Sequence, residues 1–383
     1  MILLLACIKA PPCGCDEGWG MEWEGDCVCL PHVEEEGPGV AATTFDVAAG
    51  EPLDWEAIDE ALVEGEVHVL FGAGRWEERI DILRGDTGPH RLVLDGQGHA
   101  SVAGIHTGFE DVPRSRITVR RFEVTGSRDK GIYFRAGDEV LIELNEVHDN
   151  GGSPSINLDY SNRSGHRSTS FRVLNNHIWD QTGECLYIGG SEGEDQPSHD
   201  YVEVRGNLIH DCRNLSTRND GINIKDRIGR VWVAHNVVAY TDWGIEAASP
   251  GLYEHNVVMR TDRNGLQLSD AFAPGLDGLL FVDTVVLEPG EAGVRVDSER
   301  VATSDLVFRD LVLSDPREVG LRAGGEATIS IDGLQLHGVD EVFQDWGGVS
   351  WQVEGQVRSS EPLDLQAPAG PDRLFFTGDE PWL

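Results

Sequence analysis

The chain has 383 residues, 40% of them hydrophobic, which is enough for one large domain or two ordinary ones. It contains 46 glycines, and its apolar residues rarely recur at helical spacing, so the composition favours an all-β protein rich in turns. The formal charge of −37 excludes nucleic acid and anionic membrane surfaces as natural partners, because both would be repelled.

The chain begins with an apolar stretch that ends in a cysteine. The tetrapeptide "LLAC" resembles the signal of bacterial lipoproteins, which implies that residues 1–6 are removed and that Cys7 is lipidated. The stretch is shorter than such signals, and no basic residue precedes it. We expect an exported protein, secreted or held at the cell surface or outer membrane, with the lipid anchor as its only membrane contact.

Residues 7–30 form a cysteine-rich segment with two Cys-x-Cys pairs. The cysteines of these pairs are Cys13, Cys15, Cys27 and Cys29. Their spacing is too tight for the usual zinc pattern, so we expect disulfides that join the first pair to the second in one of two pairings. Residues 31–42 then read as an acidic linker.

Repetition is the most informative feature of the sequence. Five stretches share an apolar strand, an asparagine and a polar turn. The asparagines are Asn145, Asn176, Asn207, Asn236 and Asn256, with fainter copies at Asp283, Asp310 and Asp332. The apolar residues alternate with period two, which excludes helical repeats, and a propeller blade would need four strands. The pattern predicts a solenoid of parallel strands in which stacked amides pass hydrogen bonds from coil to coil.

This pattern resembles the right-handed parallel β-helix, the fold of pectate and alginate lyases and of NosD-like surface proteins. We predict a right-handed, single-stranded parallel β-helix over residues 43–355, with a capping helix at about residues 53–63. The tail, residues 356–383, is expected to cover the last coils. We expect a monomer.

Each repeat also carries a short strand of the form Gly-apolar-x-apolar, in which the x residues point outward. Stacking places equivalent x residues in two rows, about 4.8 Å from coil to coil. The first row is Tyr133, Asn157, Tyr187, Asn223, Glu246, Gln267, Arg295 and Arg322. The second row is Arg135, Asp159, Gly189, Lys225, Ala248, Ser269 and Asp297.

Lys225 stands out because the chain has only three lysines, and lysine, unlike arginine, can act as a base. The resemblance to β-helix lyases implies that an outward cation removes a proton beside a uronate carboxylate while an acid assists the leaving oxygen. We expect Lys225 to be the base and Tyr187 the acid, with Glu246 as the third catalytic residue. In the structural alternative, Lys225 only neutralises Asp226 and Glu246.

Other polar residues around this strand are candidates for binding. The expected substrate-binding residues are Asn157, Asn223 and Gln267 in the outward row, with His199 and Arg218 in long loops, residues 189–200 and 211–220, that would wall the site. Asp159, Asp220 or Glu246 could hold Ca²⁺, which prefers oxygen ligands and would neutralise a substrate carboxylate.

We therefore expect a protein that acts on or binds polysaccharide, with a lyase favoured. A glycoside hydrolase is the alternative enzyme, because Asp220, Glu246 and Asp242 could place two carboxylates about 5 to 9 Å apart. A non-enzymatic carbohydrate-binding or structural surface module is the alternative from another class. Cys185 and Cys212 lie in consecutive coils and could form a disulfide, although their registers differ.

Overall fold

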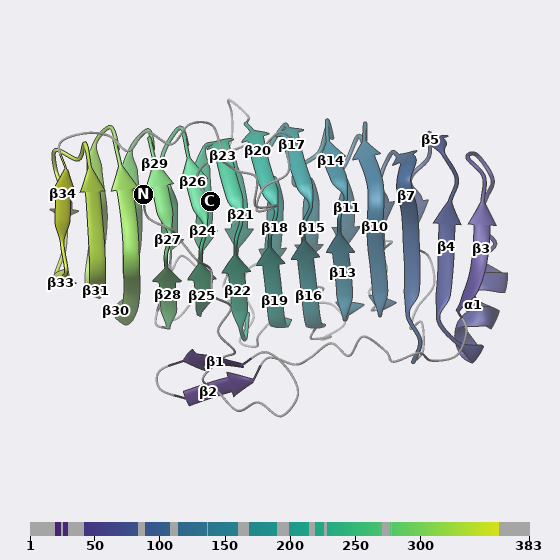
Figure 1. Cartoon of the computed structure of the whole chain (residues 1–383), viewed down its shortest axis with the longest axis horizontal. Helices are drawn as coiled ribbons and strands as arrows, with labels where there is room; N and C mark the ends of the chain where they lie inside the picture. The colour runs from purple at the N-terminus through teal and green to yellow at the C-terminus, as the bar shows by residue number, and fades with distance from the viewer. Residues whose placement is uncertain are drawn as a thin grey trace. The chain divides into compact units, whose positions relative to one another are not determined.

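The protein forms a β-solenoid, in which parallel strands of successive coils lie side by side along the long axis (Figure 1). The computed structural model describes the solenoid and the backbone of a separate hairpin. The described ranges of the solenoid are 42–82, 89–107, 114–135, 137–159, 168–189, 199–213, 219–225, 228–269, 276 and 278–359, with the backbone alone at 298–305. The solenoid confirms the predicted all-β, parallel β-helix class.

Strand pairing from coil to coil builds three walls. The first wall contains β3 (Thr43–Val47), β4 (Val67–Phe71), β7 (Leu92–Val102), β10 (Ile117–Thr125), β13 (Val140–Glu143), β16 (Ser168–Leu174), β19 (His199–Arg205), β22 (Val231–Ala234), β25 (Gly251–Glu254), β28 (Leu279–Val282), β30 (Ala292–Ser314), β31 (Val319–His337) and β33 (Ser350–Glu354). The second wall contains β5 (Gly74–Trp76), β14 (Glu146–His148), β17 (His177–Gln181), β20 (Leu208–Cys212), β23 (Val237–Thr241), β26 (Val257–Met259), β29 (Val285–Leu287) and β34 (Val357–Ser359). The third wall contains β6 (Ile80–Asp81), β8 (Ile105–His106), β11 (Ile132–Phe134), β15 (Ile156–Asp159), β18 (Leu186–Gly189), β21 (Asp220–Ile224), β24 (Trp243–Ala247), β27 (Leu266–Ser269) and β32 (Phe343–Asp345). The longest strands bend through more than one wall, and β9 (Arg114–Ser115) pairs separately with β12 (Gly137–Asp138).

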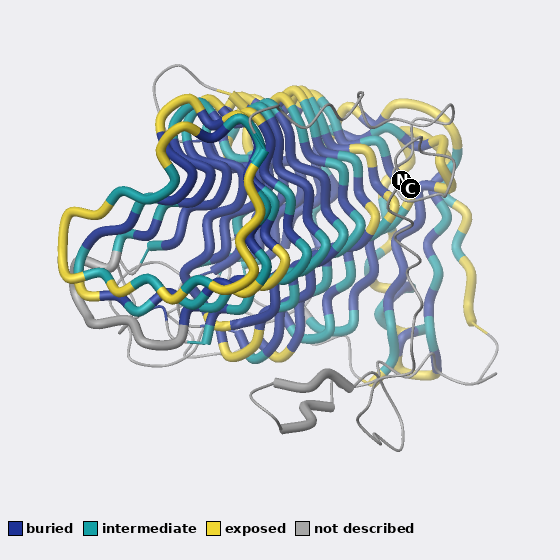
Figure 2. Tube along the Cα trace, turned by 60° about the vertical axis from the view of Figure 1, so that its left-hand side comes forward, coloured by how far each residue is buried: buried dark blue, intermediate teal, exposed yellow. Residues whose placement is uncertain are grey.

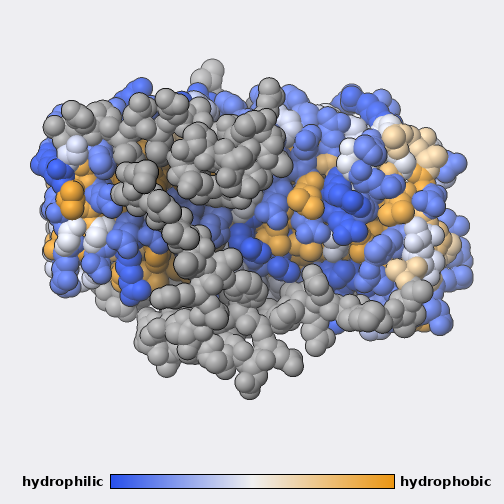
Figure 3. All heavy atoms as spheres, viewed as in Figure 1, coloured by the Kyte–Doolittle hydropathy of each residue, from blue (hydrophilic) through white to orange (hydrophobic). Residues whose placement is uncertain are grey.

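Alternation along each strand sends apolar side chains into the solenoid, and exposed residues gather at many, though not all, of the turns (Figure 2). Aromatic side chains continue this packing in the later coils, where the Phe281 ring stacks on Tyr253 and Phe308 at centroid distances of 4.7 and 5.2 Å. On the face shown in Figure 3, hydrophilic side chains dominate the described surface, with apolar ones between them.

One helix, α1 (Trp55–Glu64), lies between β3 and β4 in the sequence. Asp54 is its N-cap and accepts a hydrogen bond from the Ala57 N–H at 3.1 Å. Ile58 and Leu62 lie one turn apart and are buried in the core. The helix falls in the predicted range, and its role as a cap stays a prediction.

The asparagine ladder is confirmed. Asn145, Asn176, Asn207 and Asn236 each donate both the backbone N–H and the side-chain Nδ2 to Oδ1 of the next asparagine, ending at Asn256, over 2.9–3.1 Å. Each Nδ2, including that of Asn256, also donates to a backbone carbonyl of the preceding coil. The ladder therefore satisfies backbone groups at buried turns, which would otherwise lack partners.

The predicted continuation of the ladder through aspartates is wrong by position. Asp283 and Asp310 have φ of 46° and 51° and lie one residue before the ladder position, where the turn needs a left-handed residue that aspartate tolerates. Thr284 and Leu311 occupy the ladder position itself. Asp332 lies one residue earlier still, in a first-wall strand.

The hairpin consists of β1 (Gly20–Trp23) and β2 (Asp26–Cys29), which pair antiparallel. The predictions for residues 1–6, the anchor at Cys7, the side chains of the four pattern cysteines, the linker and the tail from residue 360 lie outside the described residues. Among the described residues, no helix is both long and apolar enough to span a membrane.

Candidate active site

The first outward row predicted from the sequence is a real row on the third wall. Strand pairing places Asn157 opposite Tyr187, Tyr187 opposite Asn223, and Asn223 opposite Glu246. Gln267 follows opposite Glu246 in the next coil. Residues about thirty positions apart in the chain are thus neighbours on one wall.

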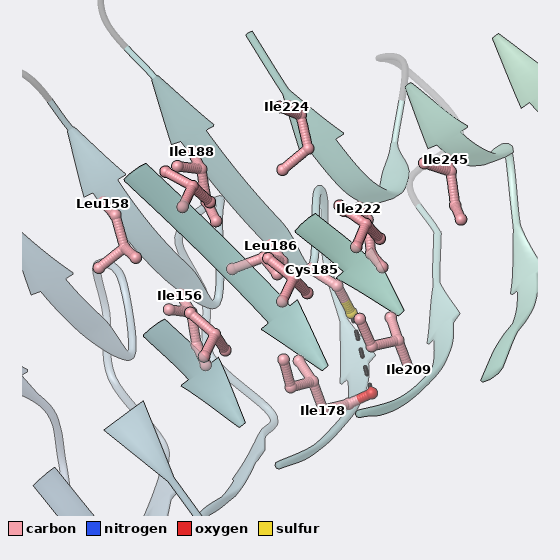
Figure 4. Close-up of a cluster of buried hydrophobic side chains, with 14 of the residues drawn as sticks. Ile156, Leu158, Ile178, Cys185, Leu186, Ile188, Ile209, Ile222, Ile224 and Ile245 are labelled. Atoms are coloured by element: carbon pink, nitrogen blue, oxygen red, sulfur yellow. Dashed lines mark hydrogen bonds between the residues drawn. The ribbon is translucent and has the colours of Figure 1, made fainter. Parts of the chain in front are cut away.

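The same wall holds these polar residues in place from behind. Ile222 and Ile224 point into the core on either side of Asn223, and Leu186 and Ile188 of the preceding coil lie beside them (Figure 4). All four side chains are fully buried. Because alternate residues of a strand face opposite sides, this packing fixes the outward direction of Asn223 and of Lys225, which follows Ile224.

Lys225 lies over the glycine of the preceding coil. Its backbone N–H donates to the Ile188 carbonyl at 2.8 Å. A Cβ atom added to Gly189 would lie 2.3 Å from the Cβ of Lys225, and Gly189 has a φ of 141°. Both the close approach and the backbone angle require glycine at position 189.

The Lys225 ammonium joins the two residues that the sequence placed beside it. Its Nζ atom lies 3.1 Å from Oε2 of Glu246, in an ion pair whose side chains are only 18% and 11% exposed. The same Nζ atom lies 5.4 Å from the centre of the Tyr187 ring, within range of a cation–π interaction. The three predicted catalytic residues are therefore neighbours, and their roles stay a prediction.

Two further carboxyl groups complete the cluster. The Asn223 Nδ2 atom donates to Oε1 of Glu184 at 2.9 Å and to Oδ2 of Asp220 at 2.5 Å. We call Glu184, Asp220, Asn223, Lys225 and Glu246 the carboxyl cluster. Four of its members were singled out from the sequence, and Glu184 was missed.

Glu184 could have been found from the repeat. Leu186 pairs with Ile222, so Glu184 occupies the same position before β18 that Asp220 occupies at the start of β21. The sequence "GECLYI" places its glycine three residues before the apolar pair, whereas "DGINI" places it directly before. Because the glycine stands at different positions in the two repeats, the sequence did not show that Glu184 and Asp220 form a third row, which lies at the turn and not on the strand.

Burial and mutual repulsion perturb the acids of the cluster. The pKa of Asp220 lies well above its usual range because the side chain is buried and because Glu246 and Glu184 repel its charge, while Lys225 acts in the opposite sense. Burial also raises the pKa of Glu184, against the opposing effects of Lys225 and of the hydrogen bond from Asn223.

The predicted binding residues do not all join this cluster. Gln267 accepts a hydrogen bond from Asn264 and donates one to Asp297, both at 2.9 Å. Asn157 is 3% exposed and lies in the row next to Tyr187. Arg218 lies outside the described residues.

His199 is placed differently from the sequence prediction. It is the first residue of β19 and not part of a wall loop, and its side chain is 0% exposed with its ring edge-on to Phe171. Burial lowers its pKa to about 3. His199 begins a first-wall strand and its ring packs against the core residue Phe171, so it does not lie in the outward row of the third wall. Its role in binding stays a prediction.

Asp159 and Asp220 cannot share one calcium ion in this structure. Asp159 pairs with Gly189 and accepts a hydrogen bond from the Tyr133 hydroxyl at 3.4 Å. Asp220 lies two coils further on and five residues before Lys225, so the two carboxyls are separated by roughly 10 Å across the strands and more along them. Ca²⁺ needs its oxygen ligands at about 2.3–2.6 Å. Among the described side chains, no group of three or more His, Cys, Asp and Glu residues could hold a metal ion.

Two other predicted residues lie beside the cluster. Asp242 accepts a hydrogen bond from Asn219 at 3.2 Å at the turn before β24, and burial raises its pKa. It therefore belongs to another group of residues, and Glu184 takes its place in the set of carboxyls. Cys185 and Cys212 are paired as a disulfide, with Cα atoms 5.8 Å apart, and both are buried behind the cluster.

The fold defines the protein as a parallel β-solenoid, and comparison with known proteins agrees. Its structure is similar to the catalytic domain of Agl-KA, with a TM-score of 0.52 and 11% identity over 82% of this chain and 69% of that one. It is also similar to an alginate lyase from Paenibacillus sp. str. FPU-7, with a TM-score of 0.49 and 14% identity over 80% and 99% of the two chains. The first of these similarities shows a shared fold and nothing further. No protein family model and no curated protein sequence matches the chain.

Proposed function

We propose that the protein hydrolyses glycosidic bonds in a polysaccharide, with the carboxyl cluster as its active site. The observation that carries this proposal is the set of three acids on adjacent coils of one outward wall, with burial raising the pKa of two of them. Glycoside hydrolysis needs one carboxyl group that holds a proton and one that is ionised, and environments that differ in this way supply both.

Glu184 is the proposed general acid. Its side chain is half-buried, its pKa is raised, and Asn223 fixes one of its oxygens. Glu246, ion-paired with Lys225 at 3.1 Å, is the proposed base or nucleophile. Asp220 is 1% exposed and acts on Asn223 and Glu246, so we assign it a positioning role. Tyr187, half-buried beside them, can stack on a sugar ring.

The reaction would proceed with one proton given and one taken. Glu184 donates its proton to the glycosidic oxygen as the bond from that oxygen to the anomeric carbon breaks. Glu246 either takes a proton from the attacking water or attacks the anomeric carbon itself, to be displaced by water in a second step. Both routes consume one water. In the covalent route Glu184 recovers its proton from the water of the second step, whereas in the direct route Glu246 keeps the proton and must pass it through solvent to Glu184 before the next turnover.

A polysaccharide lyase is the second candidate, because Lys225 lies 5.4 Å from the Tyr187 ring as a base–acid pair would require. Lys225 would remove the proton next to a uronate carboxylate, and Tyr187 would protonate the leaving oxygen. The ammonium donates to Glu246, so this route must first break the ion pair and release a proton. The hydrolase route uses the ion pair as it stands.

The test is a product assay on a panel of α-glucan, β-glucan, chitosan, pectate and alginate. Hydrolysis produces new reducing ends without ultraviolet absorbance, whereas elimination leaves an unsaturated sugar that absorbs. We expect Glu184→Gln and Glu246→Gln each to lower the rate about 10²–10⁴-fold. Glu291→Gln is the matched control, because Glu291 forms a similar ion pair with Arg263 at 3.0 Å outside the cluster.

Lys225→Arg separates the two mechanisms. Arginine keeps the positive charge beside Glu246 but does not act as a base. A hydrolase should therefore retain much of its rate, and a lyase should lose activity. Ultraviolet-absorbing product that disappears in Lys225→Arg would replace the hydrolase with the lyase. No product of either kind from any polysaccharide, together with binding on a glycan array, would indicate a carbohydrate-binding module.

A further inference from the structure

We infer that the carboxyl cluster selects sugars that donate hydrogen bonds, neutral hexoses or amino sugars, and rejects uronic acids. This inference rests on the proposed function, since it names the substrate class of the same site. The supporting observation is that the site holds buried hydrogen-bond acceptors to which none of the described residues donates.

Three oxygen atoms in and beside the cluster are buried without a donor. They are Oδ1 of Asn157, Oδ1 of Asp220 and Oδ1 of Asn223, and these side chains are 3%, 1% and 1% exposed. Buried polar atoms in folded proteins nearly always have partners, so three such atoms close together need a reason.

The orientation of Asn223 is fixed by its neighbours. Its Nδ2 atom donates to Oε1 of Glu184 and to Oδ2 of Asp220, and these two oxygens accept as long as each acid holds its proton on its other oxygen. Turning the amide over would place an oxygen against both carboxyls and lose both hydrogen bonds. The unpaired atom of Asn223 must therefore be an acceptor, and no described residue donates a hydrogen bond to it.

The charges in the cluster lead to the same conclusion. Three carboxyls stand against one ammonium, and the ammonium is already paired with Glu246 at 3.1 Å. With Glu184 and Asp220 protonated, the one remaining carboxylate balances the ammonium, so the cluster has no positive charge to spare for an anionic sugar. A uronate would bring another negative group and more acceptors to a site that lacks donors.

A sugar without a carboxylate has the opposite properties. Each hydroxyl brings one donor, and a protonated amino group brings three donors and a positive charge. Asn157 and Asn223 lie in one row, two coils apart, so the open acceptors span roughly 10 Å of the wall. A sugar chain laid along this row can donate to the acceptors on both sides of Tyr187.

The test measures binding and not turnover. Oligosaccharides of glucose, glucosamine and galacturonate, equal in length, are titrated into the Glu184→Gln variant by calorimetry, so that no product forms. The substitution removes one carboxylate and therefore favours the uronate. We expect glucose or glucosamine oligosaccharides to bind at least tenfold more tightly than galacturonate oligosaccharides. Tighter binding of glucose would indicate hydroxyl donors, and tighter binding of glucosamine would indicate ammonium donors.

A second variant examines the open acceptors directly. Asn157→Leu removes one of them and keeps the size of the side chain, so it should weaken the preferred ligand at least threefold without changing the urea midpoint of unfolding. Galacturonate that binds equally or more tightly, or no binding by any of the three, overturns the inference. Selective binding without hydrolysis on the wild-type protein would overturn the proposed function and leave the selectivity standing.

Discussion

Replacing Asn207 by alanine should destabilise the solenoid severely, although Asn207 is neither a member of the carboxyl cluster nor an apolar residue. Its Oδ1 atom accepts hydrogen bonds from the backbone N–H and the Nδ2 atom of Asn176, at 2.9 and 3.1 Å. Its Nδ2 atom donates to the Val173 carbonyl and to Oδ1 of Asn236, both at 2.9 Å. The substitution removes all four bonds at once.

The size of the effect follows from what remains buried. Asn176 is 2% exposed, so its backbone N–H would lose its acceptor with no water to replace it, at a cost of about 1–3 kcal/mol. Each of the other three bonds is worth about 0.5–1.5 kcal/mol. We expect the free energy of unfolding to fall by about 3–7 kcal/mol, a large part of the stability of an ordinary domain.

The assay is urea unfolding followed by circular dichroism, with the midpoint and slope compared between variants. Asn175→Gly is the matched control, because Asn175 is exposed with a φ of 54° and glycine already occupies the equivalent position 206 of the next coil. The control should change the stability by less than about 0.5 kcal/mol. A loss below about 1 kcal/mol in Asn207→Ala would refute the view that the ladder stabilises the stack.

Three further predictions concern protonation and packing. Burial lowers the pKa of His199 in the folded protein to about 3, against 6.5 for an unperturbed histidine, so the unfolded state binds the proton first as the pH falls. The free energy of unfolding should therefore fall by up to about 1.36 kcal/mol per pH unit below pH 6.5. Urea unfolding at a series of pH values should show a smaller pH dependence in His199→Phe. The pKa of Asp220 in the folded protein is raised above 3.8, so above pH 3.8 the folded state keeps a proton that the unfolded state has lost. The free energy of unfolding should therefore fall as the pH rises from 3.8 to the folded pKa. Asp220→Asn should not show this fall in the same urea experiments, and it should be more stable than the wild type above the folded pKa. Gly189→Ala places a Cβ 2.3 Å from the Lys225 Cβ, which should cost about 1–3 kcal/mol in thermal melts and lower product formation; an unchanged melt and rate would contradict the close packing there.

The fold and the outward row could be predicted because both depend on short-range rules. Alternation decides which side of a strand each residue faces, and the recurring apolar-x-apolar strand brings Tyr187, Asn223 and Glu246 into register although the coils between them differ in length. A pattern of period two repeated about every thirty residues contains this information without any long-range calculation.

The errors arose where one position decides the environment. Asp283 was aligned with Asn256 by chemical similarity, but the left-handed turn residue and the ladder residue are adjacent and both suit short polar side chains. His199 was predicted to lie at the end of a polar loop, whereas it is the first residue of β19 and its side chain is already buried. Glu184 was missed because turn residues do not follow the period-two pattern.

The asparagine ladder and the carboxyl cluster belong to the same stretch of the solenoid. Hydrogen bonds to ladder amides begin at the Phe122 N–H and end at Asn256, and the coils that carry Glu184, Asn223 and Glu246 lie between these limits. Beyond Thr284 an aliphatic residue, Leu311, replaces the amide. Reactive groups tolerate little positional drift, and the coils that hold them in register are the ones that the amide ladder joins in addition to backbone pairing. The later coils have backbone pairing and apolar packing without the ladder, so we expect them to open first.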